Sequence, residues 1–167
     1  MHKRFDRVAA GLLGYGAWAS AASPSLIVSF VRPENYTDAG YSRSFASEKD
    51  RAEVQRDIEE HLQRLAERRL AAGDVLKVEV LDIDLAGRFE PFRFRAGSDV
   101  RIVSDITWPR MKLRYTLTRG GQTIADAEEQ LVDMNYLVST NRYSSSDRLR
   151  YEKAMLDDWF EKRVVKR

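Results

Sequence analysis

The sequence predicts one α+β domain, residues 22–167, behind a removable N-terminal segment, residues 1–21. Three observations lead to this fold class. An apolar run typical of a strand is followed by a long stretch with apolar residues at helical spacing, and two later segments alternate between apolar and polar residues. Two glycines interrupt the second alternating segment, which predicts a hairpin. With a last helix, the order becomes strand, helix, strand, hairpin, helix, typical of a mostly antiparallel sheet with helices packed on it.

The N-terminal segment has the three parts of a secretory signal peptide. A basic start, MHKRFDR, precedes the apolar run VAAGLLGYGAWA, and Ala19 and Ala21 have the spacing that signal peptidase recognises. The apolar run is too short to span about 30 Å of hydrocarbon. We therefore predict cleavage after Ala21 or Ala22, and a mature protein without stable membrane insertion.

The charge and the cysteine content of the chain limit which partners it can bind and where in the cell it can be located. Removing the signal segment leaves 28 − 3 = 25 basic and 26 − 1 = 25 acidic residues, so the mature chain has no net charge. Proteins that bind nucleic acid through its phosphates normally have a basic excess, so we expect no nucleic-acid partner. The chain has no cysteine, which excludes disulfides and the lipid attachment that needs an N-terminal cysteine. These features predict a soluble protein that is periplasmic or secreted.

The first strand and the long helix are predicted from short local signals. Residues 26–31 are almost continuously hydrophobic, which favours an interior strand with both faces covered. Ser47 can cap the following helix together with Asp50, and Gly73 can end it.

The second strand, DVLKVEVLDID, changes phase once. Leu76, Val78 and Val80 alternate with polar residues, but after Val80 the apolar positions move by one, to Ile83 and Leu85. A slip of one residue predicts a β-bulge.

The segment RMKLRYTLTRGGQTIADAEEQ predicts a hairpin with a row of basic residues on one face. A two-residue glycine turn would set carboxylates opposite Leu113 and Tyr115, so we predict a three-residue turn, Arg119–Gly120–Gly121. This register gives three cross-strand pairs: Arg114 with Asp126, Lys112 with Glu128, and Arg110 with Gln130. The return strand would then neutralise the basic row and leave only Arg110 available. The alternative is an open cationic surface for an acidic partner.

The C-terminal helix is predicted to begin near Ser146, which can cap it, with Asp147 favourable beside the positive end of the helix dipole. Its wide apolar face consists of Leu149, Met155, Leu156, Trp159 and Phe160.

The residue types available for catalysis are few. His61 is the one histidine left in the mature chain, which excludes a metal site with two histidines, and any Ser-His-Asp triad would have to use it. Its neighbours Glu60 and Gln63 predict an ordinary, partly exposed helical residue. We assign no catalytic residue, no metal ligand and no cofactor, and the sequence does not favour an enzyme.

Carboxylates offer the alternative chemistry. Asp82 and Asp84 are two residues apart on a strand, so they should share a face about 6–7 Å apart, with Glu90, Asp99 and Asp105 on nearby segments. Such a cluster could bind Ca²⁺ or supply the acid and base of glycoside hydrolysis. It could also serve only to satisfy turn amides.

Arginine and aromatic residues gather in the segments GRFEPFRFR and TWPR. Protein interfaces and sugar-stacking platforms use such residues, although the rings could equally cover the end of the core. We define the Arg-aromatic rim as Arg88, Phe89, Phe92, Trp108 and Arg110. Asp82 and Asp84 adjoin it as further candidate binding residues.

Three segments in combination, VEVLDIDLAGRFEP, DITWPRMKLRYTLT and DMNYL followed by LRYEKAMLDDWF, resemble the bacterial secreted protein family catalogued as domain of unknown function 3016. The resemblance runs from about Leu26 to Phe160. It implies an exported protein of Gram-negative bacteria and assigns no catalytic residue.

Together these features favour an exported binding or protein-interaction module, with an envelope protein or a glycan as its partner. The alternative is a glycan hydrolase or calcium-binding protein that uses Asp82, Asp84 and Glu90. The sequence indicates no particular oligomeric state.

Overall fold

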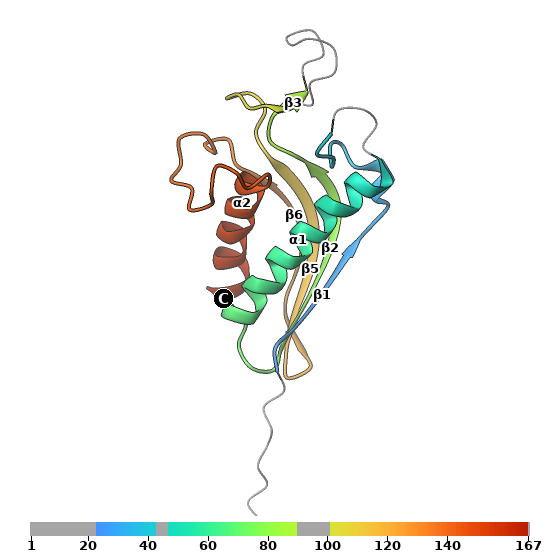
Figure 1. The fold of residues 1–167 in the computed structure, drawn as a ribbon. Coiled ribbons are helices and arrows are strands. Elements are labelled where there is room, and N and C mark those ends of the chain that lie inside the picture. The colour runs from blue at the N-terminus through green and yellow to red at the C-terminus, as the bar shows by residue number, and fades with distance from the viewer. Residues whose placement is uncertain (1–22, 43–46, 90–100, 167) are drawn as a thin grey trace, which may run out of the picture.

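The computed structural model describes residues 23–42, 47–89 and 101–166. In this part of the chain a four-stranded sheet carries two helices on one face, and a small two-stranded sheet extends from one end (Figure 1). The predicted α+β class and element order are confirmed. The predicted signal peptide, residues 1–21, lies outside the described residues.

The large sheet has the strand order β1-β2-β5-β6. Its strands are β1 Ser25–Phe30, β2 Asp74–Asp84, β5 Arg110–Arg119 and β6 Gln122–Val132. Strand β1 pairs parallel with β2, and the other two pairings are antiparallel. The small sheet consists of β3 Arg88–Phe89 and β4 Arg101–Ile102. The helices are the 3₁₀ turn η1 Pro33–Asn35, α1 Glu48–Arg69, α2 Arg150–Phe160 and the π-helical turn η2 Glu161–Val165.

The core lies between one face of the sheet and the two helices. Alternate residues of the strands point to this face because side chains of a strand alternate in direction. The ring of Tyr115 on β5 meets Trp159 on α2 edge-on, with ring centroids 5.3 Å apart. The largest fully buried side chains come from both layers: Ile58 and Leu62 of α1, Leu76 and Ile83 of β2, Met111, Leu113, Tyr115 and Leu117 of β5, and Leu156 and Phe160 of α2. None of the helices in the described ranges combines the length and hydrophobicity that crossing a membrane requires.

Helix α1 begins as the sequence predicts. The hydroxyl of Ser47 accepts a hydrogen bond from the backbone N–H of Asp50 at 3.1 Å, which satisfies one of the free amides of the first turn. The Asp50 carboxylate does not return to Ser47. It accepts two bonds of 2.9 Å from the backbone and hydroxyl of Ser42 instead, and so fastens the preceding segment to the helix.

Strand β1 is an edge strand, so its predicted interior position is wrong. Among the described strands it pairs only with β2, and Ile27 on its outer face is 52% exposed. Leu26, Val28 and Phe30 pack partly buried against the core. A short apolar run is compatible with an interior strand or with an edge strand covered by a helix, and here α1 covers it.

The predicted bulge in β2 is confirmed. The register of β2 against β5 shifts between Val80 and Asp82. The extra residue keeps Leu76, Val78 and Val80 before it, and Ile83 after it, on the buried face.

The predicted register of the β5–β6 hairpin is wrong by two residues. The turn is a two-residue one, with Gly120 and Gly121 both at positive φ, 56° and 81°. This is the turn that matches the twist of paired strands, and glycine adopts it without strain. A bulge follows at once: Leu117 pairs with Ala125, and Thr118 with Thr123. The bulge places Tyr115 opposite Ala127, but Leu113 still lies opposite a carboxylate, that of Glu129. Arg163 contacts this carboxylate at 3.2 Å, so it is tolerated beside the core.

The neutralised basic row is nevertheless confirmed, with different pairs. Arg114 lies opposite Glu128 and contacts it at 2.8 Å, and Lys112 reaches the same carboxylate diagonally at 2.7 Å. Glu79 of β2 contacts Arg114 from the other side at 2.9 Å. Hydrogen bonds from Lys112 and Arg114 hold the pKa of Glu128 below its ordinary value. This face of the sheet is therefore a charge ladder, not an open cationic stripe.

Helix α2 begins at Arg150, four residues later than predicted, and no side chain caps it. The segment before it turns on Asp147, whose carboxylate accepts from the Leu149 amide at 2.9 Å. Ser146 contacts Ser144 instead. The predicted apolar face is confirmed, because all five of its residues are buried.

Candidate functional site

The two aspartates of the DID motif hold the structure together in different ways. Asp82 accepts hydrogen bonds from the backbone N–H and hydroxyl of Thr37 at 2.7 and 2.8 Å. Asp84 is buried and lies 2.9 Å from the guanidinium of Arg88 and 3.7 Å from that of Arg110. Each carboxylate is thus already engaged by its own chain.

The part of the Arg-aromatic rim within the described ranges is paired internally. Arg110 was predicted to stay available, opposite Gln130, but it lies opposite Val132, near Asp84, with its guanidinium 5.1 Å from the ring centroid of Trp108. Phe89 lies under Arg101, at 4.5 Å. Phe92 lies outside the described residues.

Arg101 is the organising residue that sequence reasoning missed. Its guanidinium donates two bonds of 2.9 Å to the carboxylate of Asp38 and one of 2.9 Å to the carbonyl of Gly40. A bidentate arginine–carboxylate pair fixes both partners in one geometry. Because Asp38 also bridges to Asp84, this pair fixes β4 to the end of β2. The two partners are too far apart in sequence for any local pattern to reveal their contact.

This arrangement gives no support to the alternative function, a glycan hydrolase or calcium-binding protein that uses Asp82, Asp84 and Glu90. Within residues 23–42, 47–89 and 101–166, no three histidine or acidic residues gather as a metal site would require. Glu90 and Asp99 lie outside the described residues, and Asp105 is exposed.

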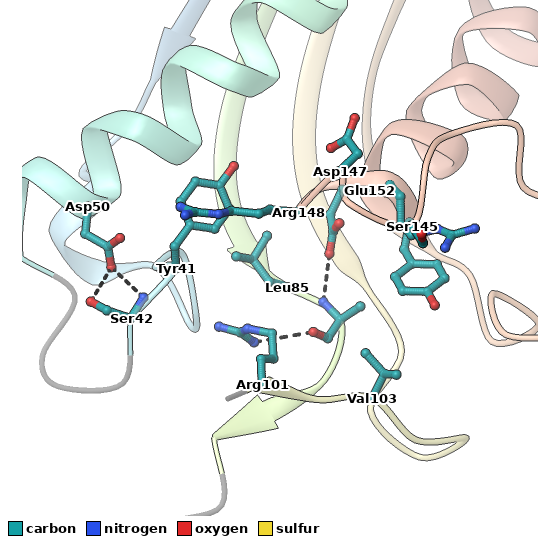
Figure 2. Close-up of a pocket in the computed structure, with 13 residues that line it drawn as sticks. Tyr41, Ser42, Asp50, Leu85, Arg101, Val103, Ser145, Asp147, Arg148 and Glu152 are labelled. Carbon is teal, nitrogen blue, oxygen red and sulfur yellow. Dashed lines mark hydrogen bonds between the residues drawn. The ribbon is translucent and has the colours of Figure 1, made fainter. Parts of the chain in front are cut away.

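A cleft lies elsewhere, where the start of α2 meets the end of β2. Its volume is about 580 Å³. Tyr41, Ser42 and Asp50 lie on one side, Leu85, Arg101 and Val103 form the floor and lower side, and Ser145, Asp147, Arg148 and Glu152 lie on the other side (Figure 2). Ala86, Arg150 and Tyr151 also line the cleft. Arg101 thus links the cleft to the rim. Most sites for small ligands have volumes of roughly 300–1,000 Å³.

Glu152, at the first turn of α2, is the most unusual group in the cleft. It is 1% exposed, and its Oε1 accepts a 2.7 Å hydrogen bond from the backbone N–H of Ala86. Its Oε2 is buried and has no hydrogen-bond partner among the described residues. Burial raises the pKa of Glu152 and outweighs the bond from Ala86 and the charge of Arg101, which act the other way. A buried polar atom without a partner is rare in proteins and requires an explanation.

Two arginines that line the same cleft, Arg148 and Arg150, have no acidic partner among the described residues. Arg148 extends across the cleft to the ring of Tyr41, with its guanidinium 4.8 Å from the ring centroid (Figure 2). Arg150 lies over Tyr151 at 5.3 Å, and its Nε is buried without a partner. Within residues 23–42, 47–89 and 101–166, neither guanidinium group forms an ion pair within 4.0 Å.

The other acids that line the cleft are engaged. Asp50 accepts from Ser42, and Asp147 pairs with Lys153 at 2.7 Å. Tyr41 donates its hydroxyl hydrogen to Asp57 on α1 at 2.7 Å. Among the described residues, the cleft therefore offers two arginines without an acidic partner and one buried carboxyl oxygen without a hydrogen-bond partner, at the positive N-terminal end of a helix.

His61 differs from its predicted role. It is 1% exposed, and its Nε2 lies 3.0 Å from Asp157 of α2, so it fastens the two helices together. Asp157 also accepts a 2.6 Å bond from the hydroxyl of Tyr143. Burial opposes ionisation of Asp157, but the bonds from His61 and Tyr143 hold its pKa below the ordinary value. The expectation of a partly exposed histidine is wrong, because position 61 faces α2.

Comparison with known proteins agrees with the resemblance seen in the sequence. A family model described as "Protein of unknown function (DUF3016)" matches residues 25–162. A search of curated proteins finds no match. The family match spans β1 through α2 and includes the cleft. The chain therefore belongs to the DUF3016 family.

Proposed function

We propose that this protein is an exported binding module, and that its ligand is a small molecule held in the cleft between α2 and the end of β2. The observation that carries the proposal is Glu152, a buried carboxyl with one oxygen unpartnered at the wall of a cleft of about 580 Å³. Isolating such a group from water costs about 1–3 kcal/mol. A ligand that supplies the missing partner would recover part of this cost.

The export part of the proposal is supported by the N-terminal pattern and by the extent of the family match. The match begins at residue 25, after the predicted cleavage site. The intact mass of protein recovered from the envelope fraction tests it. We expect a mass that lacks residues 1–21 or 1–22, and the full-length mass would contradict export by this signal.

Obstructing the cleft tests the binding part. Ser145 is exposed at the cleft wall, so Ser145→Trp should fill the cleft without disturbing the core. Ser139→Trp is the matched control, because Ser139 is also exposed and does not line the cleft. The probe is the small-molecule fraction of a Gram-negative envelope extract, dialysed against the protein and read out by native mass spectrometry.

We expect the wild type and Ser139→Trp to retain the same added mass and Ser145→Trp to lose it. Retention by all three proteins, or by none of them, would argue against a ligand in this cleft.

A further inference from the structure

The chemical class of the ligand can be inferred from the polar groups of the cleft that have no partner in the protein. Oε2 of Glu152 and Nε of Arg150 are both buried without a hydrogen-bond partner among the described residues, which is costly because burial removes their hydrogen bonds to water. Here Arg148 and Arg150 contact aromatic rings, while the acids nearby bind other groups. The unmatched groups around the cleft are therefore mostly hydrogen-bond donors.

Glu152 adds to this set of donors. Burial favours its neutral form, and a neutral carboxyl carries one O–H donor. Its Oε1 is occupied by the Ala86 amide, so the donor stands on the Oε2 side, which has no protein acceptor among the described residues. A group that accepts several hydrogen bonds and carries negative charge would complement both the arginines and this donor.

We propose that the cleft binds the oxyanion group, a carboxylate or a phosphate, of a small molecule, through Arg148 and Arg150 with Glu152 as a neutral donor. This inference rests on the proposed binding function and specifies its ligand class. Planar guanidinium groups bind carboxylate and phosphate by paired hydrogen bonds. The rings of Tyr41 and Tyr151 keep the two guanidinium groups beside the cleft.

Arg148 spans the cleft that Glu152 lines. This side chain is exposed and crosses the cleft above Leu85 (Figure 2). Exposed side chains change rotamer within nanoseconds, so an anion that recruits Arg148 can approach the wall formed by Glu152.

Small anions of defined structure provide the test. Malonate and inorganic phosphate are the anionic probes, and malonamide is the neutral probe of malonate's size. Each is titrated into the ¹⁵N-labelled mature protein at constant ionic strength. The reporters are the Nε–H signal of Arg150 and the backbone amide signal of Ala86, which contacts Glu152. The ratio of the malonate and phosphate affinities distinguishes the two oxyanions.

We expect saturable shifts of both reporters with at least one anion and none with malonamide. Arg148→Gln and Arg150→Gln should each weaken binding about tenfold, since each removes a charge-assisted hydrogen bond. Arg68→Gln, at an exposed arginine that bonds only to its own helix, should leave it unchanged.

Two results separate this inference from the proposed function. Equal responses to malonate and malonamide, or shifts that rise linearly without saturation for both anions, would overturn the oxyanion site, while loss of a neutral ligand in Ser145→Trp would preserve the binding module. Anion binding that survives Ser145→Trp unchanged would place the anion outside the cleft and contradict the oxyanion site.

Discussion

Replacing Glu152 by glutamine should stabilise the protein, by an amount that grows with pH. The glutamine carbonyl can still accept the 2.7 Å bond from Ala86, so the substitution removes an ionisable group without removing its one contact. Burial raises the pKa of Glu152 from the ordinary value of 4.5, and the nearby charges of Arg101 and Asp147 modify it in opposite directions. The folded state therefore binds a proton that the unfolded state releases.

The sign and the size of the stability difference between Glu152→Gln and the wild type follow from this extra proton in the folded state. Between pH 4.5 and the folded-state pKa of Glu152, the folded protein holds more protons than the unfolded chain, so wild-type stability falls as pH rises. The penalty grows by about 1.36 kcal/mol per pH unit, so at pH 7 it cannot exceed about 3.4 kcal/mol. Glutamine keeps an unpartnered amide donor, which reduces the gain. We expect about 1–3 kcal/mol at pH 7 and almost none at pH 4.5.

Urea unfolding of both proteins between pH 4 and 8 measures this difference, and thermal midpoints should rise by roughly 2–4 °C per kcal/mol. Glu59→Gln is the control, because Glu59 is exposed on α1, and its stability curve should follow the wild type. A Glu152→Gln gain that is the same at every pH, or a loss of stability at pH 7, would refute the reasoning.

Three further substitutions test other contacts. Asp74→Asn should cost about 1–3 kcal/mol at pH 7, because it discharges a buried carboxylate held by an arginine fork at 2.7 and 2.9 Å. That arginine depresses the pKa of Asp74, so the deficit should shrink as pH falls through the folded-state pKa; a deficit independent of pH in urea titrations would contradict this. Tyr143→Phe removes the 2.6 Å bond to Asp157 and should raise the pKa of Asp157, as measured by ¹³C NMR of its carboxyl carbon; an unchanged pKa would show that the bond does not stabilise the anion. Gly87→Ala should cost at least about 2 kcal/mol in thermal unfolding, because φ is +82° and a Cβ would lie 2.6 Å from a backbone oxygen. Gly73→Ala, at φ +83° with open space, should cost less, and equal costs would exclude the steric contribution.

The fold was predictable because its signals are local. Ser47 caps helix α1, which begins at Glu48, and the phase change after Val80 is a real bulge, since both depend on neighbouring residues. The hairpin register was not predictable by the same route. The prediction of a three-residue turn assumed regular pairing along the whole hairpin. The structure combines a two-residue turn with a bulge beside it, a combination that the prediction did not include. The edge position of β1 was not predictable because it depends on which strands pair with which, and local sequence does not determine this pairing.

The cleft at Glu152 and the contact between His61 and Asp157 both escaped prediction, although the sequence contains a signal for each. Glu152 lies three residues after Leu149 and four before Leu156, and so interrupts the apolar face of α2. His61 lies three residues after Ile58 and four before Leu65, and so interrupts the face of α1. A charged or polar residue inside an apolar stripe predicts a buried group that needs a partner. The identity of the partner, an amide of Ala86 or a carboxylate of Asp157, requires the tertiary structure.

The parallel pairing of β1 bears on the order in which the protein folds. Ser25 pairs with Val75, so the first strand has no partner until residues 74–84 are available. Contacts between distant parts of a chain form slowly, because a long loop must close first. In a chain that crosses a membrane from its N-terminus, the leading segment would thus remain unpaired while helix α1 follows it through. Because the sheet would be completed late, the polypeptide would stay unfolded while it passes through a membrane channel.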